Sequence, residues 1–318
     1  MTSAQRWLLR RSHHHAEFSA ERLAAERTET VSVVVPTREC ASTIGPVVDA
    51  LCGLQAAGAV DQVLVVDAAS ADGTAEIADR HGAEVCQEAS LLPGHGPVLG
   101  KGDAMWRGLS ATAGDIVAFV DGDTSGFSER FACGIVGPLV CEPGVQFVKA
   151  AYRRPFAVDG VVVPDGGGRV SQLSARPLLA MFYPELAAIR QPLSGEIAAR
   201  RDLLETLPFA TGYAVETAML IDVYRRIGLD GIAQVDFDER RNRHQPLDAL
   251  VPMAYAVLQV VADRLKREGR LTGVDAGHLL VAADDGMEPH PVDLIERPPL
   301  ASLGLARSAA ALPDPAVR

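Results

Sequence analysis

The sequence predicts an α/β protein whose parallel sheet is covered by helices on both faces. Between residues 31 and 151, short runs rich in Val and Ile alternate with segments whose apolar residues recur every three or four positions. Continuous apolar strands separated by helices are typical of a parallel sheet with both faces buried. The strand candidates are VSVVV (31–35), QVLVV (62–66), AEVC (83–86), DIVAFV (115–120) and VQFVKAAY (145–152).

Helix-length segments fill the intervals between these strands: TIGPVVDALCGL, GTAEIADRHG and KGDAMWRGLSATAG. After about residue 160 the texture changes, with a Gly-rich loop (164–169), a helical segment RVSQLSARPLLAMF and a short strand near GEIAAR. A helix over 214–228, a strand over 231–237 and a long helix over about 247–267 follow. We expect an N-terminal arm (1–30), a first domain (31–155), a second part (156–284) and a tail (285–318) rich in Pro and Ala.

Composition excludes several classes of protein. The chain has 318 residues, of which 48% are hydrophobic and 22% are charged, as in ordinary globular proteins. A net charge of −11 argues against a nucleic-acid partner, and no apolar stretch reaches the ~18 residues of a membrane span. The five cysteines contain no C-x-x-C pair, which favours reduced thiols in a cytoplasmic protein. The three histidines at 13–15 are expected to be solvated on a mobile arm rather than to bind a metal.

The stretch IVAFVDGDTSGF (116–127) ends an apolar strand with two acids, Asp121 and Asp123. Asp-Gly is a common turn dipeptide, so a solvated turn explains these residues as well as a metal site does. The position of the two acids favours a ligand-binding site, because ligands of open α/β sheets bind at the carboxyl ends of the strands. Asp67 and the loop PTREC (36–40) follow two other strands at that edge.

Two further clusters add phosphate chemistry. Lys101 follows a glycine and begins a predicted helix, where free N–H groups and the helix dipole favour anions. GGGRVS (166–171) offers backbone N–H groups, a guanidinium and a hydroxyl. Taken alone, a lysine such as Lys101 is more often solvated on the surface, and a segment such as GGGRVS is more often a flexible loop. Together with D-x-D, whose oxygens suit Mg²⁺ or Mn²⁺, they indicate a sugar-nucleotide transferase.

At this level of detail the chain resembles a known family. VLVVD, GKGDAMWR, FVDGD, VKAAYRRP, GGGRVSQLSARPLL, QPLSGE and PFATGYAVE are similar, in order, to motifs of the actinobacterial glucosyl-3-phosphoglycerate synthases and the related mannosyl-3-phosphoglycerate synthases. The resemblance extends from about residue 31 to 300. It implies a GT-A glycosyltransferase fold, a Rossmann-like mixed but mostly parallel sheet with a C-terminal acceptor-binding part. It also implies a homodimer that transfers a hexose from a nucleoside-diphosphate sugar to the 2-hydroxyl of 3-phosphoglycerate with retention.

The resemblance implies roles for individual residues. Those expected to bind the nucleotide sugar are Pro36, Thr37, Arg38, Glu39, Asp67, Lys101, Asp121, Gly122 and Asp123. Those expected to bind the acceptor are Gly168, Arg169, Val170, Ser171, Tyr213 and Asn242. Asp123 and His244 are expected to hold Mg²⁺ or Mn²⁺, and Glu216 and Asp123 to be catalytic. Glu216 is a nucleophile in a double displacement or an orienting group in a front-face reaction, and we favour the second.

Some positions depart from the family pattern. Cys40 stands where a glutamate is usual, which leaves the donor base open between uridine and guanosine. The family pattern H-R-N reads N-R-H here, so either Asn242 or His244 ligates the metal, and we expect His244. Glucose is the expected sugar and mannose the alternative. The rival classes are a nucleotidyltransferase, for which PTREC lacks the Gly-rich signature, and a sugar-nucleotide-binding protein without turnover.

Overall fold

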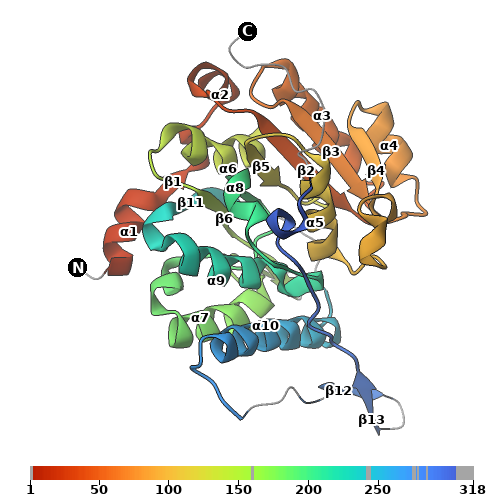
Figure 1. Cartoon of the computed structure of the whole chain (residues 1–318), viewed down its shortest axis with the longest axis vertical. Helices are drawn as coiled ribbons and strands as arrows, with labels where there is room; N and C mark the ends of the chain where they lie inside the picture. The colour runs from red at the N-terminus through yellow and green to blue at the C-terminus, as the bar shows by residue number, and fades with distance from the viewer. Residues whose placement is uncertain are drawn as a thin grey trace.

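A mixed sheet of eight strands forms the centre of the computed structural model, which describes residues 3–158, 161–240, 245–273, 277, 279–283 and 286–305 (Figure 1). The strands lie in the order β1-β11-β6-β9-β5-β2-β3-β4. Within this sheet β9 runs antiparallel to β5 and β6, and the other pairings are parallel. The expected mixed, mostly parallel sheet is therefore confirmed. The bounds are β1 Ser12–His14, β2 Val31–Thr37, β3 Gln62–Asp67, β4 Glu84–Gln87, β5 Ile116–Phe119, β6 Phe147–Arg153, β9 Ile197–Arg200 and β11 Ile232–Glu239.

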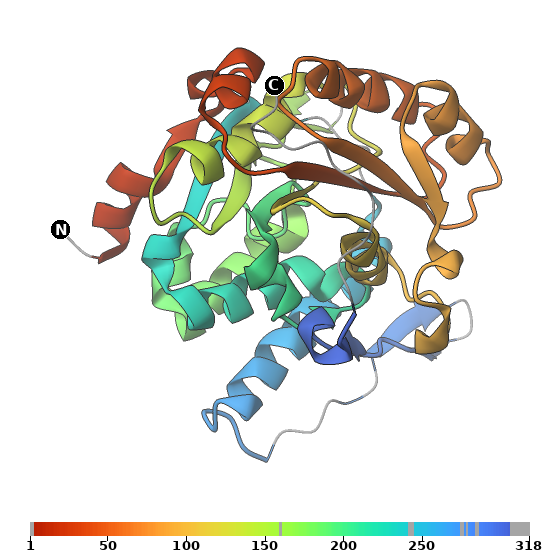
Figure 2. The ribbon, with the colours of Figure 1, turned by 45° about the horizontal axis from the view of Figure 1, so that its top comes forward.

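Helices cover both faces of this sheet (Figure 2). Strand β2 shows why, because Val33 and Val35 pack into one apolar cluster while Val34 between them packs into the other. The first cluster includes residues of α2 (Ala20–Glu26), α3 (Ile44–Ala56), α4 (Thr74–Arg80) and α6 (Glu129–Cys141). The second includes residues of α1 (Ser3–Arg11), α5 (Lys101–Ala111), α7 (Arg176–Phe182), α8 (Arg201–Glu205), α9 (Val215–Ile227) and α10 (Leu247–Arg267). None of the described helices is long and apolar enough to cross a membrane.

The N-terminal segment packs against the central sheet. Trp7 is fully buried, and its indole Nε1–H donates a hydrogen bond to the carbonyl oxygen of Ile232 at 2.8 Å. Residues 12–14 then form β1, the edge strand that pairs with β11. One buried aromatic residue and a three-residue strand carry almost no periodicity, so the pattern of the sequence did not reveal this packing.

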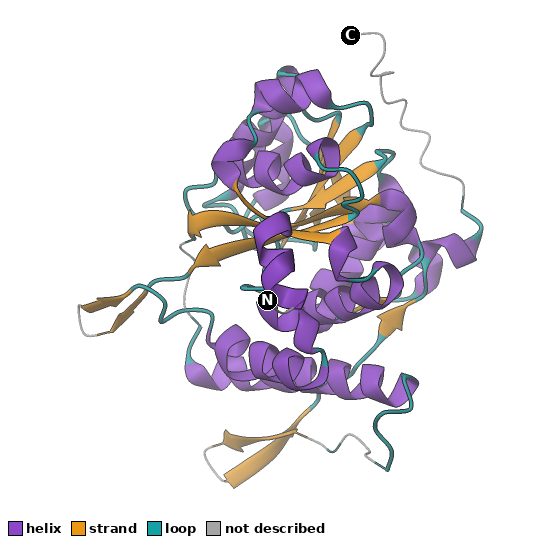
Figure 3. Cartoon of the chain, turned by 90° about the vertical axis from the view of Figure 1, so that its left-hand side faces the viewer, coloured by secondary structure: helices purple, strands orange, loops and turns teal. Residues whose placement is uncertain are grey.

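Segments after residues 155 and 285 pack with the strands and helices that precede them. Strands β9 and β11 lie in the central sheet although they come from the second part of the chain. Beyond residue 285, β14 (Glu296–Arg297) pairs with β10 (Phe209–Ala210), and Arg297 forms an ion pair with Asp103 at 2.7 Å. A β12–β13 hairpin (Leu279–Ala283 and Gly286–His290) extends from the body beyond α10 (Figures 1 and 3). A second hairpin pairs β7 (Phe156–Val158) with β8 (Val161–Val163).

Candidate active site

A cavity of about 710 Å³ lies at the carboxyl edge of the sheet. A volume of this size is typical of small-molecule sites. Its walls come from the loop after β2, the start of α5, the acids after β5, the loop before α7 and the start of α9. The predicted residues that line it are Pro36, Thr37, Arg38, Lys101, Asp121, Gly122, Asp123, Gly168, Arg169, Val170, Ser171, Tyr213 and Glu216.

Lys101 connects two of the predicted acids. Its Nζ donates to Asp121 Oδ1 at 2.6 Å and lies 2.9 Å from Glu216 Oε1. Burial alone would lower the pKa of Lys101, but the two carboxylates outweigh burial and raise that pKa above its ordinary value. Lys101 is therefore a permanent cation at the N-terminus of α5, where an anionic ligand is also favoured by the helix dipole.

Arg240, at the end of β11, was not among the predicted site residues. Its guanidinium lies 3.0 Å from Asp121 Oδ2, 3.6 Å from Asp123 Oδ1 and 2.5 Å from the buried Glu196. Its side chain is only 3% exposed. The sequence offered one signal, an arginine directly after an apolar strand at the sheet edge that binds ligands.

The two acids of DGD have different surroundings. Burial raises the pKa of Asp121, but Lys101 and Arg240 outweigh burial and hold it below its ordinary value. Burial and the neighbouring Asp121 carboxylate raise the pKa of Asp123. The Asp123 side chain is 65% exposed, whereas that of Asp121 is 18% exposed. Asp123 is thus the more accessible oxygen donor for a hard divalent cation, and the carboxylate chemistry fits Mg²⁺ or Mn²⁺.

The turn 191–196 packs closely against the ion-pair cluster of Lys101, Asp121 and Arg240. A Cβ added to Gly195 would lie 2.3 Å from Asp121 Oδ1 and 2.4 Å from Lys101 Nζ, so a larger residue here would force both side chains to shift. Lys149 supports the turn, because its buried Nζ donates to the carbonyl oxygen of Ser194 at 2.8 Å. Burial lowers the pKa of Lys149 to about 7. The sequence motifs contained these residues without indicating any role for them.

Glu39 and Asp67 do not line the cavity but support its wall. Asp67 is buried and accepts hydrogen bonds from the Ser70 hydroxyl at 2.6 Å and from Gln87 Nε2 at 3.2 Å. Glu39 Oε1 accepts the backbone N–H of Ala71 at 2.8 Å. Glu39 thus connects the loop after β2 to the loop after β3, whereas Asp67 connects the loop after β3 to β4 and accepts a hydrogen bond from Thr37 Oγ1, at the end of β2, at 3.2 Å.

The predicted acceptor loop, Gly168–Ser171, forms another part of the cavity wall. Gly168 has a φ of 66°, a left-handed conformation that favours glycine. The Arg169 guanidinium lies 5.0 Å from the centre of the Phe156 ring and donates to the carbonyl oxygen of Gln245. Ser171 is buried and begins a π-helical turn (Ser171–Ala175), while Tyr213 is 59% exposed. Asn242 and His244 lie outside the described residues.

Comparison with known proteins shows the family to which the chain belongs. The family "Glycosyl transferase family 2" matches residues 32–130. Glucosyl-3-phosphoglycerate synthase of Mycobacterium tuberculosis (strain ATCC 25618 / H37Rv) is 44% identical over 285 residues, which cover 87% of each chain. The enzyme of the same name from Petrotoga mobilis is 37% identical over 308 residues, 93% of this chain and 95% of its own. This chain belongs to the glucosyl-3-phosphoglycerate synthase family.

Solved structures place the family on the GT-A fold, as expected. Mannosyl-3-phosphoglycerate synthase from Rubrobacter xylanophilus has a TM-score of 0.87 and 46% identity, and the match covers 94% of this chain and 99% of that one. Glucosyl-3-phosphoglycerate synthase from M. tuberculosis, in complex with Mn²⁺, UDP-glucose and phosphoglyceric acid, has a TM-score of 0.77 and 43% identity. That match covers 89% of this chain and 94% of the other. The similarity that shows membership of the synthase family therefore covers nearly the whole chain.

Proposed function

We propose that this chain transfers glucose from a nucleoside-diphosphate glucose to the 2-hydroxyl of 3-phosphoglycerate, with retention, to give glucosyl-3-phosphoglycerate. The observation that carries the proposal is one cavity that contains both the DGD–Lys101 cluster and the loop Gly168–Ser171. The first suits a nucleotide diphosphate and the second a phosphorylated carboxylic acid. The related M. tuberculosis synthase binds Mn²⁺, UDP-glucose and phosphoglyceric acid.

On the donor side, Pro36, Thr37 and Arg38 form the base end of the cavity, and Lys101 faces the diphosphate. Glu39 and Asp67 hold the loop that carries this end. Asp121, with Gly122 beside it, contacts the ribose, and Asp123 and His244 would hold Mg²⁺ or Mn²⁺. The bound cation supplies Lewis-acid stabilisation of the departing diphosphate.

On the acceptor side, Arg169 provides a guanidinium that pairs in a bidentate manner with phosphate or carboxylate. The backbone around Gly168 and Val170 and the Ser171 hydroxyl provide further donors. Tyr213 and Asn242 complete this end. The nearby Arg154 also lines the cavity and adds a second positive charge for an acceptor that carries both a carboxylate and a phosphate.

Glu216 orients the reacting groups in a front-face reaction, in which the donor phosphate takes the acceptor's proton. Its Oε1 is 2.9 Å from Lys101 Nζ, and an ion-paired carboxylate is a weaker nucleophile than a free one. This contact supports orientation over a covalent glycosyl-enzyme.

An assay of purified chain tests the proposal. Incubation with 3-phosphoglycerate and UDP-glucose, GDP-glucose or GDP-mannose, with and without Mg²⁺ or Mn²⁺, measures nucleotide release. We expect release that needs acceptor and cation and that is fastest with a glucose donor. The mannosyl enzyme from R. xylanophilus, at 46% identity, makes GDP-mannose the second candidate. No release with any donor would contradict transfer, and binding of the donor without release would indicate a protein without turnover.

We also propose a cytoplasmic homodimer. All five cysteines are unpaired, which is usual for proteins in a reducing compartment. Large apolar side chains are exposed at Leu173, Met181 and Leu247, on the π-helical turn, α7 and α10, where a second copy would cover them. Light scattering coupled to size-exclusion chromatography tests this, and a monomer at high protein concentration would contradict it.

A further inference from the structure

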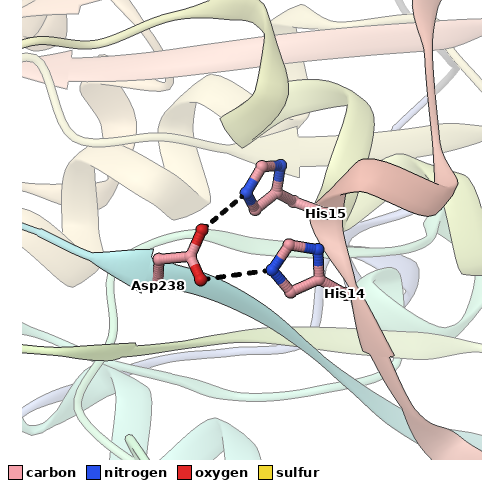
Figure 4. Close-up of side chains that lie close together, drawn as sticks. All are labelled: His14, His15 and Asp238. Atoms are coloured by element: carbon pink, nitrogen blue, oxygen red, sulfur yellow. Dashed lines mark hydrogen bonds and ion pairs between the residues drawn. The ribbon is translucent and has the colours of Figure 1, made fainter.

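A cluster of possible metal ligands lies outside the residues that line the cavity. His14 ends β1, His15 follows it, and Asp238 comes from β11, the neighbouring strand (Figure 4). The Nε2 atom of His14 is 3.2 Å from Asp238 Oδ1, and that of His15 is 3.0 Å from Asp238 Oδ2. Both rings therefore present the same type of nitrogen to one carboxylate.

We propose that His14, His15 and Asp238 form a binding site for a divalent transition-metal ion, with Zn²⁺ as the best match. Two imidazole nitrogens and a carboxylate oxygen select Zn²⁺, Co²⁺ or Ni²⁺ over the hard cations Mg²⁺ and Ca²⁺. The site is thus chemically distinct from the acidic DGD site in the cavity.

The spacing of the ligand atoms supports this assignment. Bonds of about 2.0–2.1 Å to Zn²⁺ place the ligand atoms of a tetrahedral site roughly 3.3 Å apart. The three candidate atoms all lie within 4.8 Å of one another, so small side-chain rotations would bring them into range. The Asp238 and His14 side chains are 52% and 45% exposed, which gives an ion an entry path and leaves room for a water ligand.

The backbone and the packing hold these side chains in place. A bulge between Asp236 and Glu239 interrupts the pairing of β11, and Asp238 there has a φ of 62°. Its backbone N–H donates to Asp236 Oδ1 at 3.0 Å. The His15 ring stacks on Phe237, with centroids 5.9 Å apart and planes 6° from parallel. Less side-chain freedom is therefore lost when an ion binds.

A metal-free role is the alternative. The backbone N–H of Ala16 donates to His14 Nδ1 at 3.2 Å, so the neutral ring carries its proton on Nε2 and donates it to Asp238. Metal binding at Nε2 moves that proton to Nδ1 and replaces the Ala16 contact, which is one exposed hydrogen bond. Without an ion, the cluster only anchors the N-terminal segment through hydrogen bonds.

A bound ion would link the N-terminal residues 12–17 to β11 at Asp238. Asp238 lies two residues before Arg240, whose side chain contacts Asp121 in the active site. The test uses the full chain, stripped with a chelator and held in excess Mg²⁺ so that oxygen-rich sites are filled. Zn²⁺ is then titrated against a chromophoric chelator. We expect one equivalent of bound Zn²⁺ whose affinity falls by at least about tenfold in His15→Gln and in Asp238→Asn.

His81→Gln is the matched control, because His81 Nδ1 lies 2.7 Å from Asp49 Oδ1 in an exposed pair with a single histidine. Its Zn²⁺ affinity should equal that of the wild type. Thermal melts give a second readout: Zn²⁺ should raise the Tm of the wild type and of His81→Gln, but not that of His14→Gln/His15→Gln. Equal Zn²⁺ affinity in all variants overturns the proposal, as does a Zn²⁺ equivalent that His244→Ala removes. The proposal is also overturned if the Tm of His14→Gln/His15→Gln lies below that of the wild type by the same amount in Zn²⁺ as in EDTA. The cluster would then stabilise the protein through its hydrogen bonds alone.

Discussion

Asp121 and Asp123 are two residues apart, yet their carboxylates have different partners. Asp121 accepts hydrogen bonds from Lys101 and Arg240, whereas the Asp123 side chain lines the cavity and is mostly exposed. This asymmetry supports the proposal that Asp123 rather than Asp121 holds the metal ion, because a carboxylate already paired with two cations has little capacity left for a metal ion.

Substitution of Glu216 separates the two retaining mechanisms. If Glu216 only orients the reacting groups, Glu216→Gln should lower kcat by roughly 10–100-fold, the cost of slight misplacement. Loss of a true nucleophile would cost on the order of 10⁶-fold. Mass spectrometry of the enzyme during turnover supplies the second readout, and a trapped glycosyl-enzyme would contradict the front-face reaction. Glu26→Gln, on the exposed face of α2, is the control and should retain full activity.

The exchanged pair Asn242 and His244 gives another prediction at this scale. If His244 ligates the metal, His244→Ala should raise the Mn²⁺ concentration needed for half-maximal turnover more than Asn242→Ala does. Greater damage from Asn242→Ala would instead place the metal ligand at position 242. Titration of activity with Mn²⁺ measures both.

Loss of Arg240 should destabilise the fold. Arg240→Ala leaves the buried Glu196 carboxylate without its cation, and removal of one partner of a buried pair costs about 3–5 kcal/mol. Arg190→Ala is the matched control, because Arg190 is 47% exposed and its pair with Asp236 should contribute less than about 1 kcal/mol. Urea unfolding measures both free energies. Similar losses in the two variants would mean that burial of the Arg240 pair matters little.

At the scale of elements, the turn between η5 (Pro184–Ala188) and β9 positions the ion-pair cluster. Gly195→Ala should displace Lys101 and Asp121 and lower kcat/KM by about 100-fold, since a shift near 1 Å in a positioned group has that effect. Gly53→Ala in α3 is the control, because its added Cβ meets nothing within 4 Å. That change should leave activity intact and stabilise the helix by roughly 0.5–1 kcal/mol. Full activity in Gly195→Ala would show that the close approach is unimportant.

At the scale of the whole molecule, two buried groups give stability a characteristic pH dependence. Burial raises the pKa of Glu88 to about 7 from 4.5, so the folded state binds more protons than the unfolded state in that interval. Stability therefore falls as pH rises from 4.5 to about 7. Burial lowers the pKa of Lys149 from 10.5 to about 7, so the unfolded state binds more protons above pH 7 and stability rises again.

These two groups together predict a local minimum of stability near pH 7, which urea unfolding across pH measures. Glu88→Gln should reduce the decrease in the free energy of unfolding between pH 4.5 and 7. Lys149→Met should reduce its increase above pH 7. A pH profile unchanged in both variants would contradict the assignment.

Local signals were enough for the sheet except β1 and for the edge at which the cavity lies, whereas the roles of the cavity residues came from the family resemblance. Val- and Ile-rich runs fixed the strands within a few residues, and polar residues at strand ends fixed the edge that holds the site, because both depend on neighbours in sequence. The roles of Arg240, Gly195 and Lys149, the packing of Trp7, and the meeting of His14 and His15 with Asp238 required the tertiary structure. These contacts join segments up to 225 residues apart, as between Trp7 and Ile232, and no periodicity in the chain records which distant groups meet.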